Sequence, residues 1–127
     1  MPTFQDVAQI AAKLPGVIVS PDGLAFSVEV KGKEKGFAWA WSERVDPKKP
    51  RVKNLGVLAL MVPSQTAKEI ILGSDSDKFF TEPHYNGFPA VLVRLDKIEL
   101  DELEDLLIEA WRSKAPADLR KSFEGLQ

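Results

Sequence analysis

Two short runs of alternating residues constrain the fold of this chain more than any other feature. The first covers residues 24–30, with Leu, Phe, Val and Val at every second position, and the second covers residues 37–41, with Phe, Trp and Trp. Such alternation is typical of strands that bury one face. The runs are joined by Lys31-Gly32-Lys33-Glu34, so we expect them to form a β-hairpin.

The turn of this hairpin sets its register and therefore the face on which its rings lie. With Gly32-Lys33 at the turn centre, the opposed pairs are Val28–Phe37, Phe26–Trp39 and Leu24–Trp41. All six residues lie on one face of the hairpin, so the aromatic rings share that face with aliphatic residues. We therefore expect the rings to lie in the core. The other face would carry small or polar residues: Ala25, Ser27, Glu29, Gly36, Ala38 and Ala40. A one-residue slip or a bulge would reverse the faces and offer the rings as a stacking platform.

The remaining patterns predict helices and strands in groups. Helices are expected over Thr3–Leu14, from Ser64 to Gly73 with Ala67, Ile70 and Ile71 inward, over Asp96–Lys114, and briefly over Pro116–Phe123; further strands are expected at Leu55–Val62 and within Phe79–Leu95. The order is helix, three strands, helix, two strands, helix. It predicts an α+β fold of two layers, with an antiparallel sheet of about five strands and the helices on one face. A chain of 127 residues fits a single domain over residues 1–127.

Composition excludes several classes of function. The chain has no cysteine and one histidine, which excludes disulfides and a Cys/His zinc site, and we expect no metal or other cofactor. Asp75 and Asp77 lie among serines, and we interpret them as a turn since the pattern lacks the glycine and distant glutamate of a calcium loop. No apolar stretch approaches the roughly 20 residues of a membrane span. With no signal-peptide pattern either, we expect a cytoplasmic protein.

Charge is unevenly distributed although the net charge is only −2. Residues 31–53 hold eight basic against three acidic residues, and residues 96–109 hold seven acidic against one basic. The basic residues are Lys31, Lys33, Lys35, Arg44, Lys48, Lys49, Arg51 and Lys53. Two basic loops, residues 31–35 and 44–53, are therefore candidates for gripping DNA phosphates, and the alternative is that they are solvated loops.

The segment Phe79–Leu95 contains the other candidate site. Asn86-Gly87 predicts a two-residue turn because both residues tolerate positive φ, and prolines on either side prevent regular pairing. The resulting stiff loop presents His84, Tyr85 and Asn86. Together with Arg94 and the open sheet face, these residues are candidates for binding a protein partner or a small anionic ligand. The same open face is a candidate surface for a homodimer.

An enzymatic role would have to depend on His84, which titrates near neutral pH. Glu82 lies two residues away, and no nucleophile turn, phosphate loop or spaced carboxylate pair is present. The residues therefore favour a non-enzymatic protein and leave open whether His84 acts as a base or as a structural hydrogen-bonding residue.

The chain resembles the MmcQ/YjbR family over nearly its whole length. The matching residues are Leu14-Pro15-Gly16-Val17, Gly32-Lys33, Phe79-Phe80, Pro83-His84-Tyr85-Asn86-Gly87, Leu92-Val93-Arg94-Leu95 and Trp111. Many relatives have an aromatic residue where this chain has Pro89-Ala90. The resemblance implies a compact α+β fold with helices on one side of an antiparallel sheet. Members of the family are commonly labelled DNA-binding, which is what the resemblance implies about partners.

Overall fold

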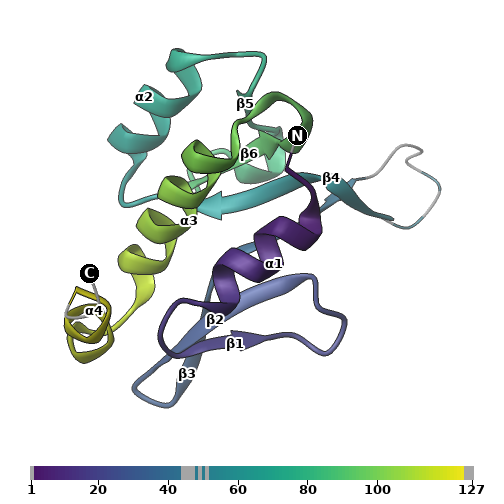
Figure 1. Ribbon diagram of the computed structural model, residues 1–127. Coiled ribbons are helices and arrows are strands. Elements are labelled where there is room, and N and C mark those ends of the chain that lie inside the picture. Colours follow the sequence, from purple (N-terminus) through teal and green to yellow (C-terminus); the bar gives the residue numbers. More distant parts are fainter. Residues whose placement is uncertain (1, 44–47, 49, 51, 125–127) are drawn as a thin grey trace.

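Six antiparallel strands form one sheet, and helices pack against one of its faces (Figure 1). The computed structural model describes residues 2–43, 48, 50 and 52–124. The strands lie in the order β1-β2-β3-β4-β6-β5. The elements are α1 Phe4–Ala12, β1 Val17–Val19, β2 Ala25–Val30, β3 Lys33–Glu43, β4 Val52–Met61, α2 Gln65–Ser74, β5 Phe79–Phe80, the 3₁₀ helix η1 Pro83–Tyr85, β6 Ala90–Arg94, the 3₁₀ helix η2 Leu95–Lys97, α3 Leu100–Lys114 and α4 Ala117–Glu124.

The predicted α+β fold of two layers is confirmed, with two differences in detail. The sheet has six strands because the short apolar run at β1 pairs with β2, so four strands precede α2 instead of three. The connection after β3 is also shorter than expected, since β3 extends to Glu43 and pairs there with Val52 of β4. The apolar strand β4 is central, as its sequence predicts.

Helices α1 and α2 begin directly after their capping residues, but the buried face of α2 was predicted wrongly. Thr3 and Asp6 form a capping box at α1, and the Ser64 side chain accepts from the Ala67 N–H at α2. Ile70, expected on the buried side of α2, is 68% exposed, whereas Lys68 is only 4% exposed. The inward face of α2 therefore contains a lysine.

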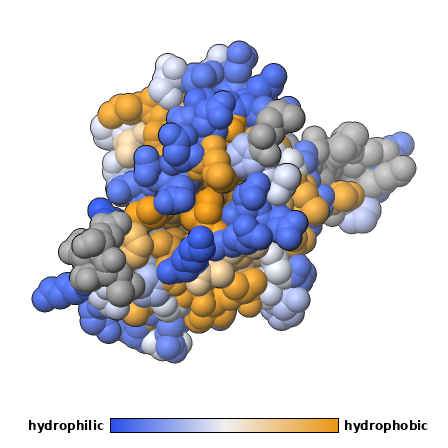
Figure 2. Space-filling view, viewed as in Figure 1, coloured by the Kyte–Doolittle hydropathy of each residue, from blue (hydrophilic) through white to orange (hydrophobic). Residues whose placement is uncertain are grey.

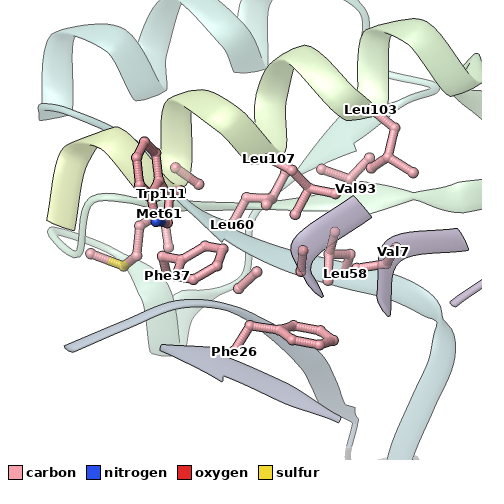
Figure 3. Packing of buried hydrophobic residues seen from close by; sticks show 14 of the residues in the cluster. Val7, Phe26, Phe37, Leu58, Leu60, Met61, Val93, Leu103, Leu107 and Trp111 are labelled. Atoms are coloured by element: carbon pink, nitrogen blue, oxygen red, sulfur yellow. The ribbon is translucent and has the colours of Figure 1, made fainter. Parts of the chain in front are cut away.

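The core lies between the sheet and helices α1 and α3. Figure 3 shows Leu103, Leu107 and Trp111 of α3 above the sheet. Trp111 is fully buried, and its Nε1–H donates to the Pro15 carbonyl oxygen at 3.0 Å. This bond fixes α3 to the corner between α1 and β1.

The β2–β3 hairpin has a different register from the predicted one. Its two-residue turn is Lys31-Gly32, with φ of 52° and 81°, so Val30 pairs with Lys33. A bulge follows: Ser27 pairs with Gly36 but Phe26 pairs with Ala38, which leaves Phe37 as the extra residue.

The bulge decides which rings are buried. Phe37 is fully buried as expected, and it is joined in the core by Ala38 and Ala40, which were predicted on the opposite face. Trp39 and Trp41 are half-buried and pack with a second, smaller cluster of residues. The expectation that all three rings line the main core is therefore wrong for the two tryptophans.

The helix-covered face presents both hydrophilic and hydrophobic residues. Figure 2 shows this side, with hydrophilic residues along α3 and hydrophobic ones at α2, between the helices and over β1. None of the helices in the described part of the chain is long and apolar enough to cross a membrane. The two tryptophans of β3 belong to the opposite face of the sheet, which we call the open face.

Candidate functional site

Five aromatic residues gather on the open face, over β4, β5 and β6. This aromatic cluster consists of Trp39, Trp41, Phe80, Tyr85 and Phe88. The Trp41 and Phe80 rings meet edge to face at 5.5 Å, and the Phe88 ring lies 6.4 Å from Trp39 and 6.0 Å from Tyr85. Beneath four of the rings, Val57, Ala59 and Leu92 are buried. The cluster thus forms a second, smaller core that covers part of the open face.

Trp39 is held in place by a hydrogen bond from its indole. Its Nε1–H donates to the Tyr85 hydroxyl oxygen at 3.2 Å. Tyr85 belongs to η1, so this bond and the contact with Phe88 fold the loop after β5 over the sheet. The loop thereby fixes the orientation of the Trp39 ring.

The other side of the Trp39 ring faces a recess of about 640 Å³, which we call the open-face hollow. Its lining includes Ala25, Ser27, Gly36 and Trp39, together with Ile18 and Val19 of the edge strand β1. Register explains the grouping: Ile18 pairs with Ser27, Ser27 with Gly36, and Ala25 with Trp39 across three strands. Three neighbouring small residues therefore leave space beside one large ring.

Gly36 contributes directly to the depth of the hollow. A Cβ built at Gly36 would lie 3.9 Å from Cε3 and Cζ3 of Trp39. The six-membered ring of the indole therefore lies next to the glycine, while its N–H edge points to Tyr85. Any larger side chain at position 36 would occupy the space beside the ring.

Two charged side chains and the Ser20 hydroxyl also line the hollow. These are Glu34 of β3 and Lys53 of β4, both of them exposed. Ser20 also lines it, but its hydroxyl donates to Asp22 Oδ1 and accepts from the Ala25 N–H at 3.1 Å. These bonds fix the turn after β1, and those to Asp22 from Ser20 and the Leu24 N–H lower the pKa of that carboxyl.

Arg94, expected to bind a ligand, instead holds neighbouring parts of the protein. Its Nη1 donates to the carbonyl oxygens of Ser76 and Asp77, both at 3.2 Å, and its guanidinium lies 4.2 Å from the centre of the Phe80 ring. It lies on β6, two strands away from β3. The structure therefore places Arg94 at the edge of the aromatic cluster and does not bring it to the hollow.

The predicted loop residues have different environments. The Tyr85 hydroxyl faces Trp39, as described, and Asn86 is exposed. Asn86 has φ of −61° and Gly87 has φ of 79°, so the Tyr85–Phe88 turn is of type II, and the expected positive φ at both central residues is wrong for Asn86. His84 lies in η1, and its side chain is outside the described part of the structure.

The described residues of the two basic segments lie near opposite ends of β3. Lys31, Lys33 and Lys35 lie at the β2–β3 turn, and the other segment follows the far end of β3. Since β3 has 11 residues, its ends are about 33 Å apart (Figure 1). In the second segment Lys48 and Lys53 are exposed, while Arg44, Lys49 and Arg51 lie outside the described residues.

Sequence reasoning missed Lys68, which is buried beneath the loop that carries Tyr85. Its Nζ donates to the carbonyl oxygens of Tyr85 at 2.6 Å and Phe88 at 2.8 Å. Burial lowers the pKa of Lys68 below its ordinary value of 10.5. The available signal was spacing, because Lys68 falls on the helical stripe that includes Ala67 and Ile71.

The aspartates after α2 form a turn. The Asp77 N–H donates to Asp75 Oδ1 at 3.0 Å, and Lys78 Nζ lies 3.9 Å from Asp75 Oδ2. Among the described residues, no group of three or more His, Cys, Asp or Glu side chains is placed to hold a metal ion.

Comparisons with known proteins reveal similar chains of matching length. The chain is 30% identical over 124 residues to the uncharacterized protein Rv2570 of Mycobacterium tuberculosis strain H37Rv, covering 97% of this chain and 96% of the relative; Mb2600 of Mycobacterium bovis matches equally. The crystal structure of Deinococcus radiodurans protein DR2400, a DUF419 domain, superposes with a TM-score of 0.63 at 20% identity over 98% of this chain and 89% of that one. This likeness concerns the fold. No protein-family model matches the chain.

Proposed function

The chain belongs to the same protein family as Rv2570 of Mycobacterium tuberculosis, and we propose that it is a non-enzymatic binding protein. Its open-face hollow takes a small ligand that has an apolar ring and an anionic group. Membership of the MmcQ/YjbR family, which the sequence resembles, is also part of this proposal. The observation that carries it is the recess of about 640 Å³ beside the fixed Trp39 ring, within the size range of small-molecule sites.

The apolar part of the ligand follows from the walls of the hollow. One wall is the six-membered ring of Trp39, and Ala25, Ser27 and Gly36 leave a shallow floor beside it. Aromatic rings pair well with such a wall in offset or edge-to-face geometry. A flat ring therefore fits this space better than a branched polar group.

The anionic group is assigned from charge. Lys53 contributes a basic side chain to the lining of the hollow. Its positive charge attracts anions, although Glu34, which also lines the hollow, opposes this in part. We therefore assign a single anionic group, placed beside Lys53.

The test uses 8-anilinonaphthalene-1-sulfonate, a ring-bearing anion whose fluorescence rises on binding. We expect saturable binding to the native protein, weakened about tenfold or more by Gly36→Leu, which fills the space beside Trp39. Gly73→Leu is the matched control, since nothing lies within 4 Å of a Cβ at Gly73. Equal affinity of both variants, or no binding to the folded native protein, would contradict the proposal.

A second pair of measurements tests the charge assignment. Lys53→Gln should weaken binding of the sulfonate but leave binding of the uncharged N-phenyl-1-naphthylamine unchanged, because only the former has a group for the ammonium. If both probes lose affinity equally, Lys53 contributes packing and the anionic assignment is wrong.

A second copy of the chain is the competing occupant of the open face. Light scattering of the native protein distinguishes the two cases. A monomer that binds the sulfonate supports the proposal. A dimer that Gly36→Leu converts to a monomer would assign the hollow to subunit contact instead.

A further inference from the structure

Lys68 is an unusual residue to find on the buried face of a helix. It is 4% exposed, and its ammonium donates to two backbone carbonyl oxygens, at 2.6 and 2.8 Å. Burying an ammonium has a large desolvation cost, and an apolar residue of similar length packs at lower cost. The pKa of Lys68 is lowered by this burial. A role beyond filling the core would explain the lysine.

The two carbonyls belong to the two ends of one turn. Tyr85 and Phe88 are its first and last residues, and the Phe88 N–H closes it by donating to the Tyr85 carbonyl oxygen at 3.0 Å. Gly87, with φ of 79°, provides the left-handed residue that this turn needs. Lys68 of α2 thus fixes both ends of the turn from beneath.

The same turn residues hold Trp39. The Tyr85 hydroxyl accepts the Trp39 Nε1–H at 3.2 Å, and the Phe88 ring lies 6.4 Å from the Trp39 ring. Trp39 in turn forms a wall of the hollow beside Gly36. A continuous series of contacts therefore leads from the Lys68 ammonium to the hollow, whose lining does not include Lys68.

We propose that Lys68 is a positioning residue for the open-face site: its ammonium fixes the Tyr85–Phe88 turn, and the turn fixes Trp39 as the wall against which a ligand ring packs. The expected effect of Lys68 on ligand affinity rests on the proposed function. The effect of Lys68 on the Trp39 indole can be measured without any ligand.

The test compares Lys68→Met with Lys78→Met. Lys78 is a suitable control because its Nζ also makes a short bond, at 2.6 Å to Glu102 of α3, but does not contact the turn. In ¹H–¹⁵N spectra, with the Trp39 indole signal assigned by Trp39→Phe, we expect Lys68→Met to shift that signal and to speed its hydrogen exchange. Lys78→Met should leave both unchanged, even if it lowers the unfolding free energy.

Affinity for 8-anilinonaphthalene-1-sulfonate provides the second readout. Lys68→Met should weaken binding roughly three- to thirtyfold at a temperature where the variant is fully folded, with Lys78→Met unchanged. If Lys68→Met does not fold, Tyr85→Phe tests the last contact, since it removes the hydroxyl that accepts from Trp39 and should shift the same signal.

The outcomes separate the two proposals. If the native protein binds the probe and Lys68→Met or Tyr85→Phe leaves the Trp39 signal and the affinity unchanged, the positioning role is overturned. If the variants shift the Trp39 signal but the native protein does not bind the probe, the turn-fixing role is supported and the ligand assignment fails.

Discussion

The Trp39 indole donates to the Tyr85 hydroxyl across 46 residues of sequence, at 3.2 Å. This bond connects the β2–β3 hairpin with the loop between β5 and β6. It links the hollow on one side of Trp39 to the aromatic cluster on the other. The proposed binding function depends on that connection.

Trp111 and Trp41 should respond differently to the same substitution. Trp111→Phe leaves the Pro15 carbonyl without its 3.0 Å donor and opens a cavity in the core, so we expect it to lower the unfolding free energy by about 2–3 kcal/mol. Trp41 Nε1 is buried and has no hydrogen-bond partner in the described structure. Trp41→Phe removes no bond and should cost less than about 1 kcal/mol.

Urea unfolding of the two variants measures this difference. Equal losses would show that the Trp111 bond to Pro15 contributes nothing beyond ring packing.

Lys31→Asn should stabilise the protein. Lys31 has φ of 52°, a region that is costly for most side chains but tolerated by Asn, which also favours this hairpin turn. We expect a gain of about 0.5 kcal/mol in urea unfolding. Lys33→Asn makes the same change within β3 and should destabilise instead. A loss at position 31 would contradict the observed turn.

Much of this fold could be predicted from the sequence, because helix caps and long periodic runs are local signals. Helices α1 and α2 begin one residue after the predicted Thr3 and Ser64, and α3 ends at Lys114 as predicted. The hairpin face could not, since the bulge at Phe37 decides it, and a bulge depends on what packs beneath the strand.

The candidate site was predicted only in part for the same reason. Tyr85 does lie on the open face, as predicted. Trp39, which donates a hydrogen bond to the Tyr85 hydroxyl, was predicted in the core because the predicted register was wrong. Lys68 has no local signal apart from a position on an apolar stripe. Its role arises from a turn about 20 residues further along the chain, which no local pattern predicts.

The pKa of Lys68 should lie below the ordinary lysine value of 10.5, and the pKa of Lys78 should lie above it. Burial lowers the pKa of Lys68, and the hydrogen bond to Glu102 raises the pKa of Lys78. A ¹³C NMR titration of the lysine Cε groups, assigned with the two Met variants, should show Lys68 losing its proton first. The reverse order would contradict the observed burial of Lys68.

These shifts also fix the sign of two stability effects. The folded protein keeps the Lys78 proton to higher pH than the unfolded chain. The contribution of Lys78 to the unfolding free energy is therefore complete below pH 10.5 and is lost as pH rises through the raised pKa. For Lys68 the unfolded chain binds more protons between the lowered pKa and 10.5, so stability rises with pH there. Comparing unfolding free energies with each Met variant separates the two.

DNA binding by both basic segments is expected to be absent. The described residues of the two segments lie near opposite ends of β3. If the two segments together neutralised five phosphates, the logarithm of the affinity would fall with the logarithm of the salt concentration with a slope of about −4 to −5. We expect fluorescence anisotropy to detect no duplex binding at micromolar protein in roughly 50 mM salt. Binding with that slope, weakened both by Ala at Lys31, Lys33 and Lys35 and by Ala at Lys48, Lys49 and Arg51, would contradict this expectation and support the DNA-binding alternative.

The most direct test of the central claim is a ¹H–¹⁵N titration of the native protein with 8-anilinonaphthalene-1-sulfonate. We predict that the amides of Ala25, Ser27 and Gly36 and the Trp39 indole shift together and saturate with one affinity, because these groups line a single recess. Shifts confined to the helix-covered face, or none on the folded protein, would contradict the assignment of the open-face hollow as the binding site.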